Sequence, residues 1–298
     1  MNILITGASG FLGRNFKEKA LANKIFSISN SSKYIKIKND YFFDLTNKSH
    51  VSLFISSTGK EKIDFLFHFA AITPFNNRHD FKKDIEISKN IRKICLALKI
   101  PFLAFSSGWV VYSQNDKKPF RENSSLYPNT EYGRSKLKTE KYFKKNLSNT
   151  TFICLRLATV FGPGQTSSGF IPNLTKSAIQ TKKITVYNPD LEKDYMFIDN
   201  LIAALNNLLK VKINKKIDMN VGSGRTYKII DIARKVQQIF KENFNEDITI
   251  EIKDYSSKDN NCNYMDISRS LKVLGDYNKV NVEKGLKEYV YWAKLVNA

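Results

Sequence analysis

The sequence has few cysteines and no long apolar run. No stretch reaches the roughly 18 consecutive apolar residues of a membrane span, and the amino terminus opens directly into a predicted strand, which leaves no room for a signal peptide. The three cysteines, Cys95, Cys154 and Cys262, are odd in number and form no CxxC pair. Since all three lie in or beside apolar segments, we expect buried thiols rather than disulfides or a metal site. These absences favour a cytoplasmic protein with no metal and no membrane contact.

Acidic residues are scarce relative to basic ones. The chain has 48 Lys and Arg against 28 Asp and Glu, a formal net charge of +20. The excess is spread over most of the chain rather than gathered in one segment. Because a nucleic-acid binder usually concentrates its basic residues on one stripe or tail, we expect no nucleic-acid partner. A diffuse positive field would instead attract anionic small ligands.

The amino terminus combines an apolar strand with a glycine-rich turn. Residues 2–6 are nearly all apolar, as expected of a strand buried on both faces, and the residues after the turn suit a helix. Between them stand Gly7, Gly10 and Gly13. The first permits a tight turn, the second lets a pyrophosphate approach, and the third removes a side chain where helix would crowd strand. Unpaired N–H groups at the helix start would face the anion, so this segment predicts a dinucleotide site.

Apolar runs alternate with helical stretches through the first half of the chain. At 298 residues and 42% hydrophobic content, the chain can bury a sizeable core. Strand-like runs recur at Ile25–Ser29, Phe65–Phe69, Phe102–Ser106 and Phe152–Leu157. This alternation predicts a doubly wound parallel sheet, whose ligands bind at the carboxyl ends of the strands.

Motifs along the whole chain resemble one known family. The turn TGASGFLG at residues 6–13 has the T-G-x-x-G-x-x-G spacing of short-chain dehydrogenases/reductases. Further motifs follow in the family's order: DLT at 44–46, HFAA at 68–71, FSS at 105–107, YGRSK at 132–136, FGPGQ at 161–165, DYMFID at 194–199, NVGSG at 220–224 and LG at 274–275. The chain therefore resembles the extended branch of that family, the NAD(P)-dependent nucleotide-sugar epimerases, dehydratases and reductases.

The resemblance implies an α/β fold, with a Rossmann-like doubly wound parallel sheet and a smaller C-terminal substrate-binding lobe. It places the NAD(P)-binding domain at residues 1–165 with about 195–220, and the substrate lobe at 166–194 and 221–298. Members of this family often dimerise by pairing the tyrosine-bearing helix and its neighbour into a four-helix bundle. We therefore expect a homodimer.

Tyr132 and Lys136 are the predicted acid/base pair. They stand four residues apart on a helical stretch, so both project from one face. A neighbouring cation favours the phenolate and lowers the pKa of a tyrosine toward working pH. By resemblance, Tyr132 is the general acid/base at the reacting sugar oxygen, and Lys136 also holds the nicotinamide ribose. The alternative interpretation is a stacked surface pair, since this helix carries several lysines.

The third catalytic residue depends on how one loop is counted. The family places a serine or threonine after the strand, usually in the pattern S-S-x-x-V-Y-G, where it hydrogen-bonds the substrate oxygen. Counting back from the Val-Tyr pair at 111–112 reaches Gly108, whereas counting forward from the strand reaches Ser107 and implies one extra loop residue. Because glycine has no hydroxyl and loops absorb insertions, we expect Ser107 to be catalytic, with Ser106 as the alternative. A structural role for both serines at the strand end stays open.

The cofactor is expected along the carboxyl edge of the sheet. The predicted end of the second strand has no acidic residue to accept hydrogen bonds from an NAD ribose, while Asn30, Ser31 and Lys33 suit a 2′-phosphate, so we favour NADP over NAD. His68 belongs to a cofactor motif, and we expect its role to be structural. By resemblance, the cofactor-binding residues are Gly7, Ser9, Gly10, Phe11, Leu12, Gly13, Asn30, Ser31, Lys33, Asp44, Leu45, Phe69, Ala70, Ala71, Tyr132 and Lys136.

Cationic side chains are expected to hold the diphosphate of a nucleotide sugar. Arg156 begins a block similar to the family's R-x-x-x-V-Y-G-P-G, and Lys193 stands where an arginine usually precedes Asp-Phe. The predicted substrate-binding residues are Ser107, Arg156, Lys193, Arg225 and Arg269. For Lys193, Arg225 and Arg269 the alternative is solvated surface charge.

These residues favour an NADP-linked reductase of a nucleotide-linked 4-keto sugar, with Tyr132 as the proton donor. The main alternative is a C4 epimerase that oxidises and re-reduces the same carbon with tightly bound NAD. Dehydratases of the family carry an Asp-Glu pair where this chain has Gly108 and Trp109, which argues against a dehydratase. A third hypothesis is a non-catalytic dinucleotide-binding scaffold or sensor, against which the intact Tyr132 and Lys136 weigh.

Overall fold

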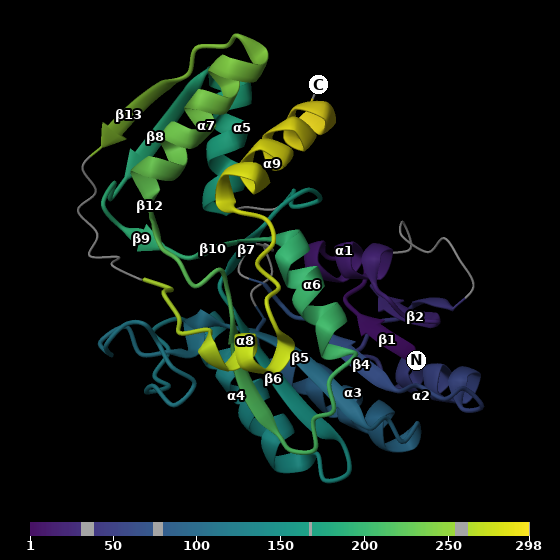
Figure 1. Ribbon diagram of the computed structural model, residues 1–298. Helices are drawn as coiled ribbons and strands as arrows, with labels where there is room; N and C mark the ends of the chain where they lie inside the picture. Colours follow the sequence, from purple (N-terminus) through teal and green to yellow (C-terminus); the bar gives the residue numbers. More distant parts are fainter. Residues whose placement is uncertain (31–38, 74–79, 167–168, 254–261, 298) are drawn as a thin grey trace.

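A seven-stranded parallel sheet forms the larger part of the molecule (Figure 1). The structure is a computed structural model that describes residues 1–30, 39–73, 80–166, 169–253 and 262–297. The strand order is β11-β6-β5-β4-β1-β2-β3, and neighbouring strands run parallel. The strands are β1 Asn2–Thr6, β2 Lys24–Ser29, β3 Asp40–Phe42, β4 Phe65–His68, β5 Phe102–Gly108, β6 Thr151–Leu157 and β11 Ile217–Val221. The chain thus winds outward from β1 in both directions, which confirms the predicted doubly wound α/β fold.

Helices cover both faces of this sheet because its strands are apolar on both sides. Successive side chains of a strand point to opposite faces, so Ile3 and Ile5 join one core cluster while Leu4 joins another. The first cluster includes residues of α1 and α6, and the second includes residues of α2, α3 and α4. These helices are α1 Phe11–Lys19, α2 Lys48–Thr58, α3 Lys83–Ala97, α4 Glu131–Asn146 and α6 Ile198–Leu208.

A second group of elements gathers at one end of the molecule, at the top of Figure 1. There β8 pairs in parallel with β13, next to three helices. These elements are α5 Phe170–Thr181, β8 Lys183–Tyr187, α7 Ile229–Phe244, β13 Thr249–Lys253 and α9 Val282–Asn297. Two short strand pairs connect this group to the large sheet: β7 Thr159–Phe161 with β10 Tyr195–Phe197, and β9 Glu192–Lys193 with β12 Tyr227–Lys228.

Two further short helices lie against the large sheet. The 3₁₀ helix η2 covers Trp109–Val111 directly after β5, and α8 covers Ser268–Leu274 and contacts β11. β11 and α8 therefore bring two late segments of the chain back to the first sheet. The domain boundaries given above stay a prediction. No helix among the described residues is both long and apolar enough to cross a membrane.

The three cysteines are free thiols, but they are not equally buried. Cys95 and Cys154 are buried, as expected, and burial raises the pKa of the Cys95 thiol to about 12. Cys262 is partly exposed, so the expectation of three buried thiols is wrong at that position.

Candidate active site

The glycine turn after β1 leaves no room for side chains. A Cβ added at Gly7 would lie 2.6 Å from the backbone nitrogen of Ala70, and one added at Gly13 would lie 2.3 Å from the carbonyl oxygen of Gly7. Gly7 also has φ +70°, a conformation that favours glycine. Gly10, the N-cap residue of α1, has no side chain to accept a hydrogen bond from the first N–H groups of the helix. This cradle of bare backbone fits the pyrophosphate of a dinucleotide.

The other predicted cofactor residues follow neighbouring strands at the same edge. Ser9, Phe11 and Leu12 are partly exposed at the start of α1. Asn30 is exposed after β2, and Ser31 and Lys33 lie outside the described residues. Asp44 is exposed after β3, and Phe69, Ala70 and Ala71 are partly exposed after β4. The structure thus brings these residues to the carboxyl ends of four adjacent strands, where ligands of such sheets bind.

Leu45 is the exception within that set. Its side chain is 6% exposed and packs in the core cluster that includes α2 and α3. Its carbonyl oxygen accepts a hydrogen bond from the Asn90 amide at 2.7 Å. The side chain of Leu45 thus serves the core, and its predicted place in the cofactor site stays a prediction.

Tyr132 and Lys136 project from one face of α4, as their spacing predicts. Thr130 begins this helix by accepting a hydrogen bond from the Gly133 backbone N–H at 3.0 Å. Lys136 is buried, its Nζ donates to the Ser106 carbonyl oxygen at 2.9 Å and lies 5.5 Å from the centre of the Tyr132 ring. Tyr132 is partly exposed. Lys136 is thus a buried residue and not part of a solvated surface pair. The catalytic role of both residues stays a prediction.

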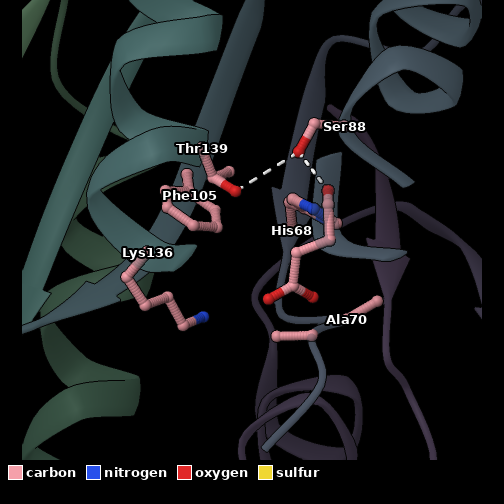
Figure 2. A pocket seen from close by; sticks show the side chains of 8 residues that line it. His68, Ala70, Ser88, Phe105, Lys136 and Thr139 are labelled. Carbon is pink, nitrogen blue, oxygen red and sulfur yellow. Dashed lines mark hydrogen bonds between the residues drawn. The ribbon is translucent and has the colours of Figure 1, made fainter. Parts of the chain in front are cut away.

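A small pocket lies beside Lys136, between α4 and the end of β4. Figure 2 shows Lys136, Phe105 and Thr139 on one side and His68 and Ser88 on the other. The pocket is lined by His68, Ala70, Ala71, Asp84, Ser88, Phe105, Lys136 and Thr139. Ala70 and Ala71, two predicted cofactor residues, thus line the same pocket as Lys136.

Asp84 fixes the shape of this pocket and was missed from the sequence. It is buried in the first turn of α3, where it accepts hydrogen bonds from the Ile72 backbone N–H at 2.8 Å and from the Ser135 hydroxyl at 2.7 Å. It therefore ties the segment after β4 to both α3 and α4. An acidic residue that begins a helix gives no signal of such long-range contacts in the sequence.

His68 has a structural position. Its Nδ1 is 2.7 Å from the Thr6 hydroxyl, which links the ends of β4 and β1. Burial, with a smaller effect from the charge of Lys136, lowers the pKa of His68 to about 3. The ring is therefore neutral at working pH, and it carries no proton for the reaction.

Ser107 is buried and held by a residue of α4. Its hydroxyl donates to the Glu140 carboxylate at 2.5 Å, and the residue is 5% exposed. Burial alone would raise the pKa of Glu140, but Arg156 and Ser107 outweigh that effect and lower it, so the carboxylate stays charged and holds the serine. The catalytic and substrate-binding roles of Ser107 stay predictions, and this hydrogen bond gives the serine a structural role as well. The backward count, which reaches Gly108, fits the structure without an extra loop residue, because β5 extends through Gly108.

Arg156 belongs to the same buried network. Its side chain is fully buried, and its Nη2 is 2.8 Å from Glu140 Oε2. Its Nη1 donates to the Tyr112 hydroxyl at 3.0 Å, and this hydroxyl donates to Asn220 at 2.6 Å. Its neighbours in β6, Leu155 and Leu157, pack in the core on the other face of the sheet. Since successive side chains of a strand point to opposite faces, Arg156 points toward α4 and away from solvent. The structure gives Arg156 a structural role in this network, and its predicted contact with substrate stays a prediction.

Glu140 is the second residue that the sequence analysis missed. It follows Lys136 by four residues, as Lys136 follows Tyr132. This spacing places all three on one helical face, and it was a usable signal.

The three remaining cations lie in different places. Lys193 is partly exposed, and its Nζ is 5.5 Å from the centre of the Trp109 ring, next to the end of β5. Arg225 is exposed in the segment between β11 and β12. Arg269 donates to the carbonyl oxygen of Asp218, near the start of β11, at 3.0 Å. Ligands of parallel sheets bind beyond the other end of the strands, and the predicted role of Arg269 stays a prediction.

A family model matches most of the chain. The NAD dependent epimerase/dehydratase family model aligns with residues 3–222. The chain belongs to this family. The match spans the glycine turn, the Tyr132 helix and the last strand of the large sheet.

Relatives support the family assignment over nearly the whole chain. The ADP-L-glycero-D-manno-heptose-6-epimerase of Brachyspira hyodysenteriae is 26% identical over 261 residues, which cover 80% of this chain and 81% of the relative. The dTDP-4-dehydro-6-deoxyglucose reductase of Escherichia coli is 24% identical over 97% of this chain and 96% of its own. The UDP-glucose 4-epimerase of Thermotoga maritima, solved with UDP-glucose, shares the fold with a TM-score of 0.85 at 22% identity, and each chain is covered completely.

As a member of this family, the protein is an NAD(P)-dependent enzyme of nucleotide-sugar modification. The bare glycine backbone after β1 fits the dinucleotide independently of that assignment. The family thus accounts for the two features that the structure brings together, a dinucleotide cradle and a tyrosine with a buried lysine.

Proposed function

We propose that the protein is a nucleotide-sugar epimerase that retains NAD and uses it transiently. The observation that carries this proposal is the recurrence of epimerases among relatives that align over most of the chain. The reductase of Escherichia coli is a relative of similar identity, so the reductase that we favoured from the sequence is the second candidate. Its support was the missing acidic residue at the end of the second strand, in a segment that lies outside the described residues after Asn30.

The acid/base step falls to Tyr132. Tyr132 is partly exposed, and Lys136 Nζ lies 5.5 Å from the centre of its ring. The Tyr132 hydroxyl would exchange a proton with a sugar hydroxyl. When held at the glycine turn, NAD would supply reversible hydride transfer at the sugar carbon. Lys136 is held by the Ser106 carbonyl oxygen, so its position is fixed by β5 rather than by substrate.

The cofactor is positioned by backbone rather than by charge. Gly7, Gly10 and Gly13 bring the start of α1 close to the ends of β1 and β4, and the helix N-terminus favours an anion there. The relatives act on sugars linked to ADP, UDP or dTDP. We propose a nucleoside-diphosphate sugar as the substrate, and a homodimer as the assembly.

The first experiment is mass spectrometry of the small molecules that the freshly purified protein releases on denaturation. We expect NAD at about one equivalent. We also expect interconversion of a nucleotide sugar without added cofactor, tested on UDP-glucose, UDP-glucuronic acid and ADP-glycero-manno-heptose. An empty site, together with NADPH consumption on a 4-keto sugar nucleotide, would replace the epimerase with the reductase.

A further inference from the structure

Trp109 is only partly covered by the core that it packs against. It is the first residue after β5, at the carboxyl edge of the sheet, and it is partly exposed. It packs on a small core that includes Val111, Tyr112 and Phe120, which are almost fully buried. A large aromatic side chain that keeps exposed area at a ligand-binding edge offers contact area to a ligand.

The segment that carries Trp109 packs directly against the first turn of α4. A Cβ added at Gly133 would lie 2.4 Å from the Val110 carbonyl oxygen, so no side chain separates the two backbones. Gly133 follows Tyr132, the proposed acid/base residue. Trp109 and Tyr132 therefore belong to two backbone segments in direct contact.

A residue from a later strand also contacts the indole of Trp109. Lys193 Nζ lies 5.5 Å from the centre of the Trp109 ring, within the range of a cation–π contact. Lys193 belongs to β9, which pairs with β12. Trp109 thus lies where the large sheet meets the later elements, and its ring is oriented before any ligand arrives, which lowers the entropic cost of binding.

We propose that Trp109 is the surface on which the sugar ring of the substrate stacks, and that it orients the reacting carbon toward Tyr132. The ligand chemistry is a nucleotide-linked pyranose, whose C–H face packs on the indole. This inference rests on the proposed function, because it names the residue that recognises the sugar of that substrate. Trp109 acts as a specificity-determining residue and transfers no proton.

The chain contains two tryptophans, which gives a matched pair of variants. Trp292 lies on α9 with its ring 5.6 Å from that of Tyr289, and it belongs to no part of the proposed site. Trp292→Phe leaves Trp109 as the sole tryptophan, and Trp109→Phe leaves Trp292. Both variants are loaded with NAD and titrated with UDP-glucose, UDP-glucuronic acid and ADP-glycero-manno-heptose, with UDP and ADP as sugar-free controls.

We expect the emission of Trp292→Phe to change on addition of a nucleotide sugar that binds, and not on addition of the matching nucleotide alone. Trp109→Phe should show no change with either. Binding is followed independently by calorimetry. A nucleotide sugar that binds without altering Trp109 emission would overturn the inference and leave the proposed function intact. Failure of every nucleotide sugar to bind would overturn the proposed function, and the inference with it.

Steady-state kinetics on the converted sugar separate stacking from a merely structural role. Trp109→Ala should raise KM about 10- to 100-fold, and Trp109→Phe should recover most of that loss because a phenyl ring can still stack. NAD retention should be unchanged in both variants. A loss in Trp109→Ala that Trp109→Phe does not recover, or that includes NAD, would overturn the inference in favour of structural packing.

Discussion

The end of β1 and the end of β5 lie at the same edge of the sheet, but different constraints shape them. After β1, close packing of the backbone determines which residue fits, because a Cβ at Gly13 would lie 2.3 Å from another backbone atom. At the end of β5, the backbone leaves room for side chains, and the direction of each side chain determines its role. Gly108 is extended, with φ −162°, and a Cβ there would lie 3.7 Å from its nearest neighbour. Glycine is required in the first segment and merely present in the second.

This difference explains why spacing in the sequence is informative for one motif and ambiguous for the other. A glycine turn is recognised from the spacing of its glycines, because the structure needs residues without side chains at those positions. A hydroxyl on a strand depends on the face toward which it points, and a shift of one residue reverses that face. Ser107 therefore points to Glu140, although it is the direct neighbour of Gly108, the position that the backward count gives for the catalytic hydroxyl.

The largest expected effect concerns Tyr132. Tyr132→Phe removes the only proton that the ring can transfer, so we expect kcat to fall about 10²- to 10⁴-fold. NAD retention should stay unchanged, since the glycine turn is untouched. Turnover and released cofactor are measured on the same preparation. Unchanged turnover would show that the acid/base group lies elsewhere.

The comparison between the two strand ends can be tested with one substitution at each. Gly13→Ala forces a clash between backbone atoms, so we expect a loss of about 3 kcal/mol in the free energy of unfolding and loss of bound NAD. Gly108→Ala is the matched control and should change stability by less than about 1 kcal/mol. Urea unfolding gives both values. Equal losses at the two positions would contradict the distinction drawn here.

Much of the fold could be predicted because its signals are local. The four apolar runs named from the sequence became β2, β4, β5 and β6, since each run is long enough for a strand and is apolar on both sides. The partners of the short strands could not be predicted. β9 and β12 have two residues each, and their pairing depends on contacts between distant segments.

The site was predictable where spacing along one helix carries the information. Tyr132 and Lys136 could be paired from their interval of four residues. The role of Arg156 could not, because its partners Glu140 and Tyr112 come from two other elements. A charge in the sequence is ambiguous between a ligand contact and a buried ion pair until the burial of its neighbours is known.

A smaller effect is expected at Ser107. Ser107→Ala removes one hydrogen bond from the buried carboxylate of Glu140, so we expect a loss of about 1–3 kcal/mol in the free energy of unfolding. The kcat of the folded enzyme should fall less than about tenfold. Turnover below the unfolding transition separates the two roles. A fall in kcat as large as that of Tyr132→Phe, with stability unchanged, would support the catalytic role.

The smallest effect concerns His68, whose Nδ1 is 2.7 Å from the Thr6 hydroxyl at the end of β1 and whose ring centre lies 5.6 Å from that of Phe105 in β5. Burial lowers the pKa of His68 to about 3, whereas an unfolded histidine has a pKa near 6.5. Below pH 6.5 the unfolded chain therefore binds a proton that the folded protein does not, and stability falls as pH falls. Between pH 7 and pH 5.5 this contribution amounts to about 1 kcal/mol.

His68→Gln should remove the contribution of His68 to the pH dependence of the unfolding free energy. Any loss of stability from the change of side chain itself is the same at both pH values. Unfolding free energies of both proteins at pH 7 and pH 5.5 give the difference. Burial raises the pKa of Asp194 to about 6, so Asp194 acts in the opposite sense over this range, but it is common to both proteins and cancels. An identical slope for wild type and variant would mean that His68 titrates normally, and that the ends of β1 and β4 admit water.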